Sequence, residues 1–569
     1  MPRCRGRSPC LSCQGSVSSK SGFMPAKDIA IAGCGPAGLA AALMLHRDGH
    51  RVRLFERFET PRPVGSGLMI QPTGLAVLRE LKLAEATLAA GARIDRLFGR
   101  AEPSQHIVLD VRYAALGQDA GHGIGIHRAA LFDILHDAAR EAGIAVEGGR
   151  SVASSEIVGA NRRALIFADG TRTEPFDLIV DALGTMSPLA RHQGRPLAYG
   201  ALWASLDWPH SAGFDMATLE QRYIRASTMV GVLPIGRLAQ GPTAKAAFFW
   251  SLRCDGLSDW QRSGLAAWKA DVLKLWPATA PLLAQIETPD QLTFARYAHR
   301  TTPVPTEPGL IHIGDSWHST SPQLGQGANM ALLDAFALAK ALRDGNEATT
   351  APGLAIAARR RHVWLYQTMS ALFTPVYQSD SRVLPLLRDR IAGPLARIWP
   401  APAILAAMVS GLIGAPLKRL GLRAPAAVRL GDAIEAQTRG RRLIVFDGEC
   451  VMCSRQAQFV MRHDHERRFT LTTAQGPLGQ ELYHRLGFPR QDFKTMLLVE
   501  DGRVLSQSDA VIAIAAKLGW PWRIAVAARV IPRPLRDRLY RLVARNRYRW
   551  FGRRETCWRP TPDMADRIL

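Results

Sequence analysis

The chain has 569 residues, of which 47% are hydrophobic and 21% are charged. This length and composition exclude a short peptide-binding module, a disordered chain and an all-apolar membrane bundle, and they favour a folded protein of about three domains. Lys and Arg number 72 against 49 Asp and Glu, so the net charge is +23. The one basic stretch, Arg523 to Arg559, shows no zinc-finger, RNP or helix-turn-helix pattern. We therefore interpret it as a solvated face and expect no nucleic-acid partner.

The N-terminal segment and the cysteines indicate the compartment. Eight irregularly spaced cysteines do not fit a disulfide-stapled secreted scaffold, so we expect a reducing, cytoplasmic environment in which a Cys-x-x-Cys pair is catalytic or binds metal. Residues 1–26 have no apolar run long enough for a signal peptide, and we expect a disordered extension. Met24 directly precedes a strand pattern and is the expected true start. Cys10 and Cys13 would then form no site.

The first strong motif is KDIAIAGCGPAGLAAALMLHRDGHRVRLFER, which predicts a strand, a glycine-rich turn, a helix and a second strand. Gly33 permits the tight turn, Gly35 lets the backbone approach a pyrophosphate, and Gly38 lets the helix pack closely on the strand. The helix would begin at Pro36 and Ala37 and offer its N-terminus to the phosphates. A merely glycine-rich turn is the structural alternative.

Two further features extend this prediction to a specific dinucleotide. Glu56 ends the second strand and can accept hydrogen bonds from the ribose of an adenosine. The segment Leu310–Leu342 then predicts a strand that ends at Asp315, followed by a loop and a helix over Ala328–Leu342. Asp315 would bind a second sugar, the ribityl chain, while the loop lets a flat ring lie against bare backbone. The loop residues that would contact this ring are Pro322, Gly325, Gln326 and Gly327.

With both motif blocks in this order, residues 27 to about 420 resemble the single-component FAD-dependent aromatic hydroxylases, the family of 4-hydroxybenzoate hydroxylase and the ubiquinone-biosynthesis hydroxylases. The resemblance implies a Rossmann-type α/β FAD-binding domain with an inserted mixed or antiparallel substrate sheet near 195–300. It implies FAD as the bound cofactor and NAD(P)H as a transient reductant. Family members form a C4a-hydroperoxide with O₂ and transfer one oxygen to an electron-rich ring. A small aromatic or quinone-like substrate is therefore expected.

The same resemblance implies further site residues and shows one departure. It places Arg128 near the FAD at the start of a helix, and residues 62–67 beside the flavin ring. A surface arginine and a plain turn are the alternatives. The segment FDLIVDALGTMSPLARH has Leu183 where the family carries Asp, with Asp181 two residues earlier. Preference for NADH or NADPH therefore cannot be predicted from this motif.

Aromatic and histidine side chains in this half allow two interpretations each. Alternating segments between Tyr199 and Trp250 predict an antiparallel sheet. Its aromatic side chains either line a substrate pocket or form ordinary core; they are Trp203, Trp208, Phe248, Phe249 and Trp250. The histidines are interpreted as structural rather than catalytic, since flavin hydroxylation needs no metal; they are His122, His312 and His318.

An uncharged stretch, Ile398–Leu417, is long enough to cross a bilayer but is interrupted by prolines and glycines. We expect a short buried or interfacial helix, with a transmembrane span and peripheral membrane contact as the alternatives. A polar, Ala-rich joint at 426–440 then separates residues 27–425 from a last domain, residues 441–569.

The last domain carries a Cys-x-x-Cys pair in LIVFDGECVMCSRQAQFVMRHD. The pattern predicts a strand that ends at Phe446 and a helix that begins near Cys453. Cys450 would lie near the helix N-terminus with Arg455 nearby, which favours its thiolate, so Cys450 is expected to attack and Cys453 to resolve. An inert pair and a zinc site are the alternatives. The other candidate zinc ligands are His463, His465 and Cys557.

This region resembles the DCC family of thiol-disulfide oxidoreductases in its motif Asp447-Gly-Glu-Cys450-Val-Met-Cys453. The resemblance continues through a hairpin turn at Asp501-Gly502 to RYRWFGRRE near the C-terminus. It implies a thioredoxin-like fold and a thiol partner. No proline precedes the expected strand Met496–Val499, where thioredoxins keep a cis-proline.

The sequence thus predicts an FAD-dependent monooxygenase fused to a thiol-disulfide redox domain. One alternative is a flavin-dependent disulfide reductase that passes electrons to Cys450 and Cys453. A second alternative is a non-catalytic redox-sensing or docking protein. We expect a cytoplasmic protein, with contact to a membrane surface as the alternative location.

Overall fold

The computed structural model describes the chain in fourteen stretches. These are residues 26–61, 66–116, 121–159, 161–191, 194–209, 212–238, 241, 243–422, 442–485, 493, 495–500, 503–531, 533–553 and 567–568. Several predictions lie outside the described residues: the extension at 1–25, the loop at 62–65, the joint at 426–440, the turn at 501–502 and Cys557. The hydrophobic cores fall into two groups, one within residues 29–422 and one within residues 443–568.

A six-stranded sheet carries the nucleotide-binding half of the first group, with strand order β19-β20-β11-β1-β2-β8. All neighbouring strands are parallel except β19 and β20. The strands are β1 (Asp28–Ala32), β2 (Arg51–Phe55), β8 (Ala145–Glu147), β11 (Leu178–Asp181), β19 (Thr306–Glu307) and β20 (Leu310–His312). Because β1, β11 and β20 are neighbours, the ends of these three strands meet at one edge of the sheet.

Three helices pack around this sheet: α1 (Pro36–Arg47), α4 (Arg128–Glu141) and α7 (Gly327–Arg343). Helix α1 contacts both α4 and α7. Its alanines at 40, 41 and 42 are fully buried, and such small side chains let neighbouring helices approach closely. The predicted helix Ala328–Leu342 is confirmed as α7, one residue longer at each end.

The predicted antiparallel substrate sheet is confirmed, but it is larger than expected. Its seven strands follow the order β17-β13-β16-β15-β14-β5-β6. They are β5 (Arg96–Ala101), β6 (Ile107–Arg112), β13 (Tyr199–Asp207), β14 (Thr218–Ile224), β15 (Thr228–Arg237), β16 (Ala244–Arg253) and β17 (Thr293–Ala295). Strands β5 and β6 precede the expected range of 195–300, and β5 pairs with β14 in parallel. The sheet is therefore mixed and is built from two distant parts of the chain.

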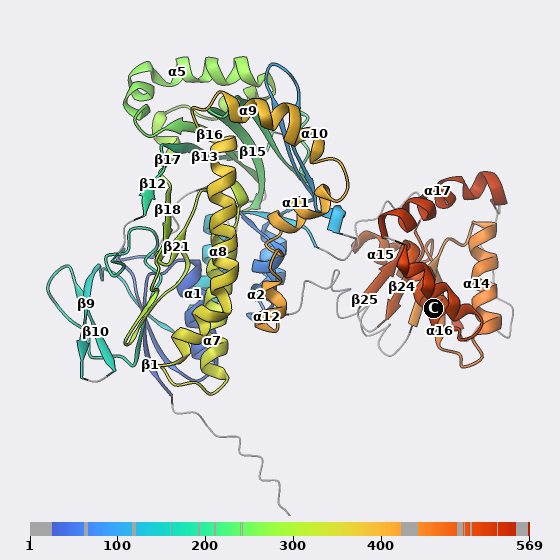
Figure 1. Ribbon diagram of the computed structural model, residues 1–569, viewed down its shortest axis with the longest axis horizontal. Coiled ribbons are helices and arrows are strands. Elements are labelled where there is room, and N and C mark those ends of the chain that lie inside the picture. The colour runs from blue at the N-terminus through green and yellow to red at the C-terminus, as the bar shows by residue number, and fades with distance from the viewer. Residues whose placement is uncertain are drawn as a thin grey trace, which may run out of the picture.

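The two faces of this sheet pack against different parts of the protein. Leu202 and Phe248 belong to a core on one face, which is covered by α5 (Leu257–Leu275), as Figure 1 shows. Phe249 and Leu233 belong to a second core on the opposite face, where β15 contacts β3 and β7 of the nucleotide-binding half. The alternation of a pleated strand thus separates neighbouring residues of one strand between two environments.

Short elements complete this body. Two three-stranded sheets have the orders β3-β7-β4 and β12-β18-β21, and β9 pairs with β10 in a hairpin. The strands are β3 (Gly67–Ile70), β4 (Ala92–Ile94), β7 (Gly123–His127), β9 (Val152–Val158), β10 (Arg162–Phe167), β12 (Arg195–Pro196), β18 (Ala298–Thr301) and β21 (His318–Ser319). The helices are α2 (Pro72–Glu80), α3 (Ala84–Ala90), η1 (Tyr113–Leu116), η3 (Pro277–Thr279), α6 (Ala280–Leu283), η4 (Pro289–Gln291), η5 (Gly314–Ser316) and η6 (Pro322–Leu324).

Helices follow the second motif block. They are α8 (Ala351–Tyr377), α9 (Val383–Leu387), η7 (Arg388–Ala392), α10 (Gly393–Leu395), α11 (Ala401–Val409) and α12 (Pro416–Leu420). The uncharged stretch Ile398–Leu417 thus contains α11, a short helix that packs on β6 and η1, as predicted. Among the described helices, none combines the length and apolarity that crossing a bilayer requires.

The C-terminal unit, orange and red in Figure 1, is a four-stranded sheet with helices. Its elements are β22 (Arg442–Phe446), α14 (Val451–His463), β23 (Phe469–Thr473), α15 (Pro477–Arg485), β24 (Leu497–Glu500), β25 (Arg503–Ser506), α16 (Gln507–Lys517), η8 (Trp522–Val530) and α17 (Arg533–Phe551). The sheet order is β23-β22-β24-β25, with only β22 and β23 parallel. This is the expected thioredoxin-like α/β arrangement. The strand predicted at Met496–Val499 is β24, one residue later.

Candidate functional site

The glycine-rich turn has the geometry that its spacing predicts. Gly33 adopts a φ of +105°, and a Cβ there would lie 2.5 Å from the carbonyl oxygen of Ala182. A Cβ on Gly38 would lie 2.0 Å from the carbonyl oxygen of Gly33. Beside Gly35, in contrast, nothing lies within 4 Å of the Cβ position. The turn is therefore closed at Gly33 and Gly38 and open at Gly35, where a phosphate group would approach.

Helix α1 leaves its N-terminus free for an anion. Gly35 is its N-cap, no side chain caps it, and Pro36 occupies the first turn with Ala37. The first N–H groups of a helix have no partner within the helix, so they and the helix dipole favour a negative charge. Glu56 follows β2, and its carboxylate accepts hydrogen bonds from the backbone N–H of Cys34 at 2.9 Å and of Phe58 at 3.2 Å. Its remaining lone pairs stay available to ribose hydroxyls.

Strand β20 ends at His312, three residues before the predicted end at Asp315, and Asp315 lies in the following short helix η5, near the ends of β1 and β11. Its side chain is accessible to solvent, yet desolvation raises its pKa while His318 and Arg128 oppose the rise. The charge of Arg128 thus acts on Asp315, which is also a predicted FAD-binding residue.

A buried ion-pair cluster fixes the backbone next to Asp315. Asp334 of α7 accepts hydrogen bonds from the backbone N–H of Gly314 at 3.0 Å and from Arg359 of α8 at 2.8 Å, and it pairs with His318 at 2.6 Å. All of these side chains are at most 2% exposed. Burial alone would raise the pKa of Asp334, but His318 and Arg359 outweigh it and lower the pKa. His318 is therefore part of a structural cluster, as interpreted from the sequence.

The loop from Pro322 to Gly327 is held near its C-terminal end by two hydrogen bonds. Gly325 adopts a φ of +60°, and its carbonyl oxygen accepts a hydrogen bond from the Asn329 amide at 3.0 Å. The Gln326 amide donates to the carbonyl oxygen of Val409, at the end of α11, at 2.5 Å. This loop therefore forms a fixed surface between α7 and α11.

Two polar atoms beside this loop are buried without a hydrogen-bond partner: Nε2 of Gln71 and Oε1 of Gln326. The Gln71 Nε2 atom lies 3.7 Å from the Cβ position of Gly325. Buried polar groups are normally paired, because an unpaired one costs about 1–3 kcal/mol. The unpaired Gln71 donor beside bare loop backbone fits a carbonyl group at the edge of a flat ring, as a flavin carries, whereas the Gln326 Oε1 atom lies 2.9 Å from the Cβ position of Gly411.

The aromatic residues proposed from the sequence fall on two faces. Trp208, Phe248 and Trp250 pack in the core under α5. Trp203 and Phe249 lie on the other face, with ring centroids 4.7 Å apart. That face is the one from which β15 contacts β3 and β7. The interpretation as ordinary core is confirmed for Trp208, Phe248 and Trp250, whereas a substrate-lining role for Trp203 and Phe249 stays a prediction.

Tyr297 extends the aromatic face toward the second motif block. The Trp203 indole N–H donates a hydrogen bond to the Tyr297 hydroxyl at 2.8 Å. Burial raises the pKa of Tyr297 to about 12, and the nearby charge of Arg128 opposes the rise. Arg128 is thus electrostatically coupled to both Asp315 and Tyr297. Sequence patterns gave no signal for Tyr297, because it lies outside the alternating strands.

In the altered motif around Leu183, the acidic residue Asp181 has a structural role. Asp181, at the end of β11, is fully buried. It accepts hydrogen bonds from the N–H of Leu183 at 3.0 Å and from the hydroxyls of Ser187 at 2.6 Å and Ser316 at 3.1 Å, and it pairs with His312 at 2.6 Å. The carboxylate therefore ties the ends of β11 and β20 together. His312 is structural, as interpreted.

The Cys-x-x-Cys pair begins α14. The helix starts at Val451, two residues before the predicted start, so Cys450 itself is the N-cap and its sulfur accepts from the N–H of Cys453 at 3.3 Å. Both cysteines are free thiols. Hydrogen bonding from Cys453 lowers the pKa of Cys450 to about 6, against an opposing effect of burial. The same interaction raises the pKa of Cys453.

The cation next to the pair is Arg547 of α17, not the predicted Arg455, which is exposed. Arg547 is buried and donates to the Asp447 carboxylate at 2.7 Å. Burial opposes ionisation of Asp447, but hydrogen bonds from Tyr548, Arg547 and Gln475 outweigh it and lower its pKa. The motif aspartate therefore orients the guanidinium that contributes to the low pKa of Cys450. Arg547 is 94 residues from Cys453, so local sequence could not reveal it.

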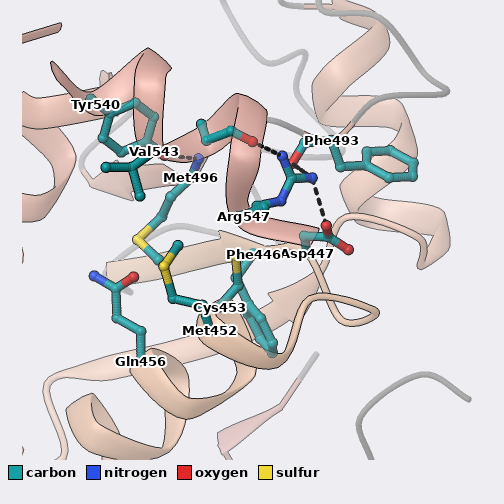
Figure 2. A pocket seen from close by; sticks show the side chains of 11 residues that line it. Phe446, Asp447, Met452, Cys453, Gln456, Phe493, Met496, Tyr540, Val543 and Arg547 are labelled. Atoms are coloured by element: carbon teal, nitrogen blue, oxygen red, sulfur yellow. Dashed lines mark hydrogen bonds and ion pairs between the residues drawn. The ribbon is translucent and has the colours of Figure 1, made fainter. Parts of the chain in front are cut away.

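A cavity opens beside this pair, and Figure 2 shows its lining. Cys453 lines it together with Arg547 and Tyr540 of α17 and Met496 before β24. Cys450 is fully buried, because the backbone at Arg553 pairs with it and the Arg553 side chain binds Glu449 at 2.9 Å. The low pKa thus belongs to Cys450, whereas Cys453 is the sulfur that reaches the cavity. Among the described residues, no group of three or more His, Cys, Asp or Glu is arranged to hold a metal ion.

Comparisons with known proteins agree with both sites. A family model described as an FAD binding domain matches residues 26–354, and one described as a DCC1-like thiol-disulfide oxidoreductase matches residues 444–553. The chain belongs to both families. Its first part is an FAD-binding monooxygenase and its last part is a DCC domain.

Individual relatives match the two parts separately. Salicylate hydroxylase of Pseudomonas putida is 27% identical over 347 residues, which cover 56% of this chain and 77% of the relative. The protein YuxK of Bacillus subtilis is 36% identical over 128 residues, which cover 22% of this chain and 93% of the relative. The structure of Klebsiella pneumoniae HpxO with FAD and uric acid has a TM-score of 0.56 at 18% identity, covering 68% of this chain and 97% of the other. That last likeness shows the fold.

The monooxygenase family identifies the cofactor as FAD, with NAD(P)H as the reductant typical of the family. The residues at both motif blocks fit this group: open space at Gly35, a free α1 N-terminus, an accessible carboxylate at Asp315 and an unpaired amide donor at Gln71. Which of them contact FAD stays a prediction, as do the domain boundaries.

Proposed function

We propose that this FAD-binding monooxygenase uses NAD(P)H and O₂ to hydroxylate a small aromatic or quinone-like molecule, and that its DCC domain carries a thiol-disulfide redox pair. The observation that supports the substrate class best is the face formed by Trp203, Phe249 and Tyr297. The charge of Arg128 acts on both Tyr297 and Asp315, so this face and the predicted flavin site lie within electrostatic range of one arginine. The relatives of this chain support the same substrate class, because they include a salicylate hydroxylase, an FAD-dependent urate hydroxylase and a 6-hydroxynicotinate 3-monooxygenase.

The proposal assigns each predicted FAD residue a task. Gly35 and the α1 N-terminus, with Pro36 and Ala37, bind the pyrophosphate, while Gly33 and Gly38 set the turn. Glu56 binds the adenosine ribose. Asp315 binds the ribityl chain, and Arg128 offsets its charge. The loop residues Pro322, Gly325, Gln326 and Gly327 support the ring. Bound FAD supplies the electron transfer and the activation of O₂.

Protein groups on the substrate side orient the ring and exclude water. Trp203 and Phe249 offer flat apolar surfaces on which an aromatic substrate can stack, at about 0.5–1.5 kcal/mol beyond area burial. The Tyr297 hydroxyl accepts from Trp203, so its own proton remains available to donate to a substrate oxygen. A high pKa keeps this hydroxyl protonated at neutral pH. We propose a cytoplasmic location for the enzyme.

In the DCC domain, the proposal gives Cys450 the thiolate and Cys453 the second thiol. Attack by Cys450 on a disulfide forms a mixed disulfide, which Cys453 then displaces to leave a Cys450–Cys453 disulfide and two reduced sulfurs on the partner. A partner disulfide could reach Cys450 by two routes. Either the backbone at Arg553 moves aside, or the partner enters through the cavity that Cys453 lines.

The test is anaerobic reduction of the purified holoprotein by NADPH or NADH, with flavin absorbance and free thiols followed in the same sample. The proposal expects the flavin to bleach while the thiol count stays constant, followed by oxygen insertion in a screen of phenols and quinones. A gain of two thiols at the expense of reduced flavin would instead show a flavin-dependent disulfide reductase. A Cys450→Ser, Cys453→Ser variant is the matched control for the thiol count.

A further inference from the structure

One surface of the DCC domain is both apolar and strongly basic. It is formed by η8 and α17, which Figure 1 shows in red. Large apolar side chains on it are exposed to an unusual degree: Trp520 77%, Ile524 70%, Val530 88%, Ile531 49%, Leu535 58%, Leu539 65%, Leu542 53%, Trp550 52% and Phe551 46%. An exposed apolar patch of this kind marks an interaction site. We call these side chains, with the exposed arginines among them, the η8–α17 surface.

Helix α17 divides its circumference into three stripes. Tyr540, Val543, Ala544 and Arg547 face the domain and line the cavity beside Cys453. Leu535, Leu539, Leu542 and Trp550 recur at the spacing of one helical face and form an exposed apolar ridge. Arg538, Arg541, Arg545 and Arg549 recur at the same spacing on the adjacent face and are exposed.

Charge on this surface is almost all of one sign. Between Gly519 and Arg553 the chain has ten arginines and a single acidic residue, Asp537. Asp537 is already paired with Arg533 at 3.4 Å and bound by Ser508 at 2.5 Å. The exposed arginines beside the ridge therefore have little local compensation. A helix with Trp, Phe and Leu on one face and arginines along its border is typical of the interface of an anionic bilayer.

We propose that the η8–α17 surface binds an anionic lipid bilayer, with the apolar ridge of α17 in the interface and the arginine row against lipid phosphates. The inference goes beyond the monooxygenase proposal and does not depend on it. Because the opposite face of α17 lines the Cys453 cavity, binding would hold the redox pair one helix diameter from the lipid surface.

The charge of the η8–α17 surface favours an anionic lipid bilayer over a second copy of the chain. A second copy of this surface would bring two arginine rows together. A second exposed apolar ridge among the described residues includes Ile398 and Trp399. It is bordered by Arg382, Arg390 and Arg397, so it would also repel the η8–α17 surface. Nucleic acid would satisfy the arginines but leave the apolar ridge in water, and that ridge lacks the pattern of a base-reading module.

The test is flotation of the FAD-loaded full chain with vesicles of phosphatidylglycerol and phosphatidylcholine, compared with vesicles of phosphatidylcholine alone. The inference expects binding only to the anionic vesicles, weakened by added salt. Loss of one arginine near an anionic surface costs about fivefold in affinity. The triple variant Arg538→Gln, Arg545→Gln, Arg549→Gln should therefore bind about 100-fold more weakly.

Two matched variants show whether a loss of vesicle binding comes from the η8–α17 surface itself, from the lower net charge of the protein or from misfolding. Arg140→Gln, Arg172→Gln, Arg262→Gln removes three equally exposed arginines from the FAD-binding part and should bind vesicles as the wild type does. Leu539→Ser, Leu542→Ser keeps the charge and should lose binding as well. The ultraviolet titration of the Cys450 thiolate, unchanged in each, confirms that the domain is folded.

Three results would overturn the inference. These are equal binding to both kinds of vesicle, equal loss in the two arginine triples, and absence of vesicle binding. In the last case, binding to duplex DNA or RNA would identify a nucleic-acid surface. A dimer that dissociates in Leu539→Ser, Leu542→Ser would identify an interface between copies.

Discussion

Replacing Gly38 or Gly35 of the glycine-rich turn by alanine should have opposite effects on the stability of the FAD-free protein. In Gly38→Ala the new methyl group would lie 2.0 Å from the Gly33 carbonyl oxygen, so α1 and the turn must separate by about 1 Å or more. Such overpacking costs about 1–3 kcal/mol, and the melting temperature of the FAD-free protein should fall by several degrees. In Gly35→Ala nothing in the protein lies within 4 Å of the methyl group, and the φ of −82° suits alanine. The FAD-free protein should therefore keep its melting temperature.

The two variants should also differ in their affinity for FAD. The Gly35→Ala methyl group occupies the space at the α1 N-terminus that we assign to the pyrophosphate, so FAD affinity should fall about 5- to 150-fold, the equivalent of 1–3 kcal/mol. Flavin fluorescence gives the affinity, and calorimetry of FAD-free protein gives the melting temperature. Wild-type FAD affinity in Gly35→Ala, or equal destabilisation of the two FAD-free variants, would refute the assignment of this turn.

Three further results follow from buried charges and hydrogen bonds. Arg547→Met should raise the pKa of Cys450 above about 6, so the thiolate absorbance that grows as pH rises through 6 should shift to higher pH; Arg455→Met, which changes an exposed arginine, should leave the midpoint in place. Asp334→Asn should destabilise the FAD-binding part by about 3–5 kcal/mol in a melting experiment, because it leaves the Arg359 guanidinium buried without a counter-charge; Asp137→Asn, at an exposed site, is the control, and equal effects would contradict the explanation. Tyr297→Phe should lower the melting temperature by the equivalent of about 1–3 kcal/mol, since the Trp203 indole N–H loses its acceptor; an unchanged value would mean that this bond contributes nothing.

The sign of the Cys450 effect also sets a dependence of stability on pH. Its pKa is lowered in the folded protein, so the folded state gains stability as pH rises from about 6 toward the ordinary thiol value, and loses that gain as pH falls through 6. A depressed thiol pKa also stabilises the dithiol form, which makes the corresponding disulfide more oxidising.

Local patterns were sufficient where backbone geometry determines the site. The spacing of Gly33, Gly35 and Gly38 predicted a turn closed at two positions and open at one, and the contacts agree because they depend only on the chain next to them. The strand ending at Phe446 and helix α7 were predicted within a residue for the same reason. Helix α14 began earlier than predicted, because the Cys450 sulfur caps it in place of the usual Ser, Thr, Asp or Asn.

Long-range packing determined what the sequence could not reveal. Arg455 is close to the cysteines in sequence, but α17 brings Arg547 beside them. Tyr297 reaches Trp203 from a segment without strand alternation. For the aromatic strands, alternation could assign side chains to two faces, but only the packing shows that α5 covers one face and that the other face meets β3 and β7.

The pairing of β5 with β14 has a consequence for how this protein can be divided. Arg96 lies opposite Thr218, while β11, between them in sequence, belongs to the nucleotide-binding sheet. Neither sheet can therefore be completed until the chain has passed through the other at least once, and long-range contacts of this kind form late in folding. The substrate sheet is thus not a portable module: cuts at 195 and 300 would remove five of its strands and leave the β5–β6 pair without its neighbour β14. Exchange of substrate specificity between relatives would have to transfer both segments together.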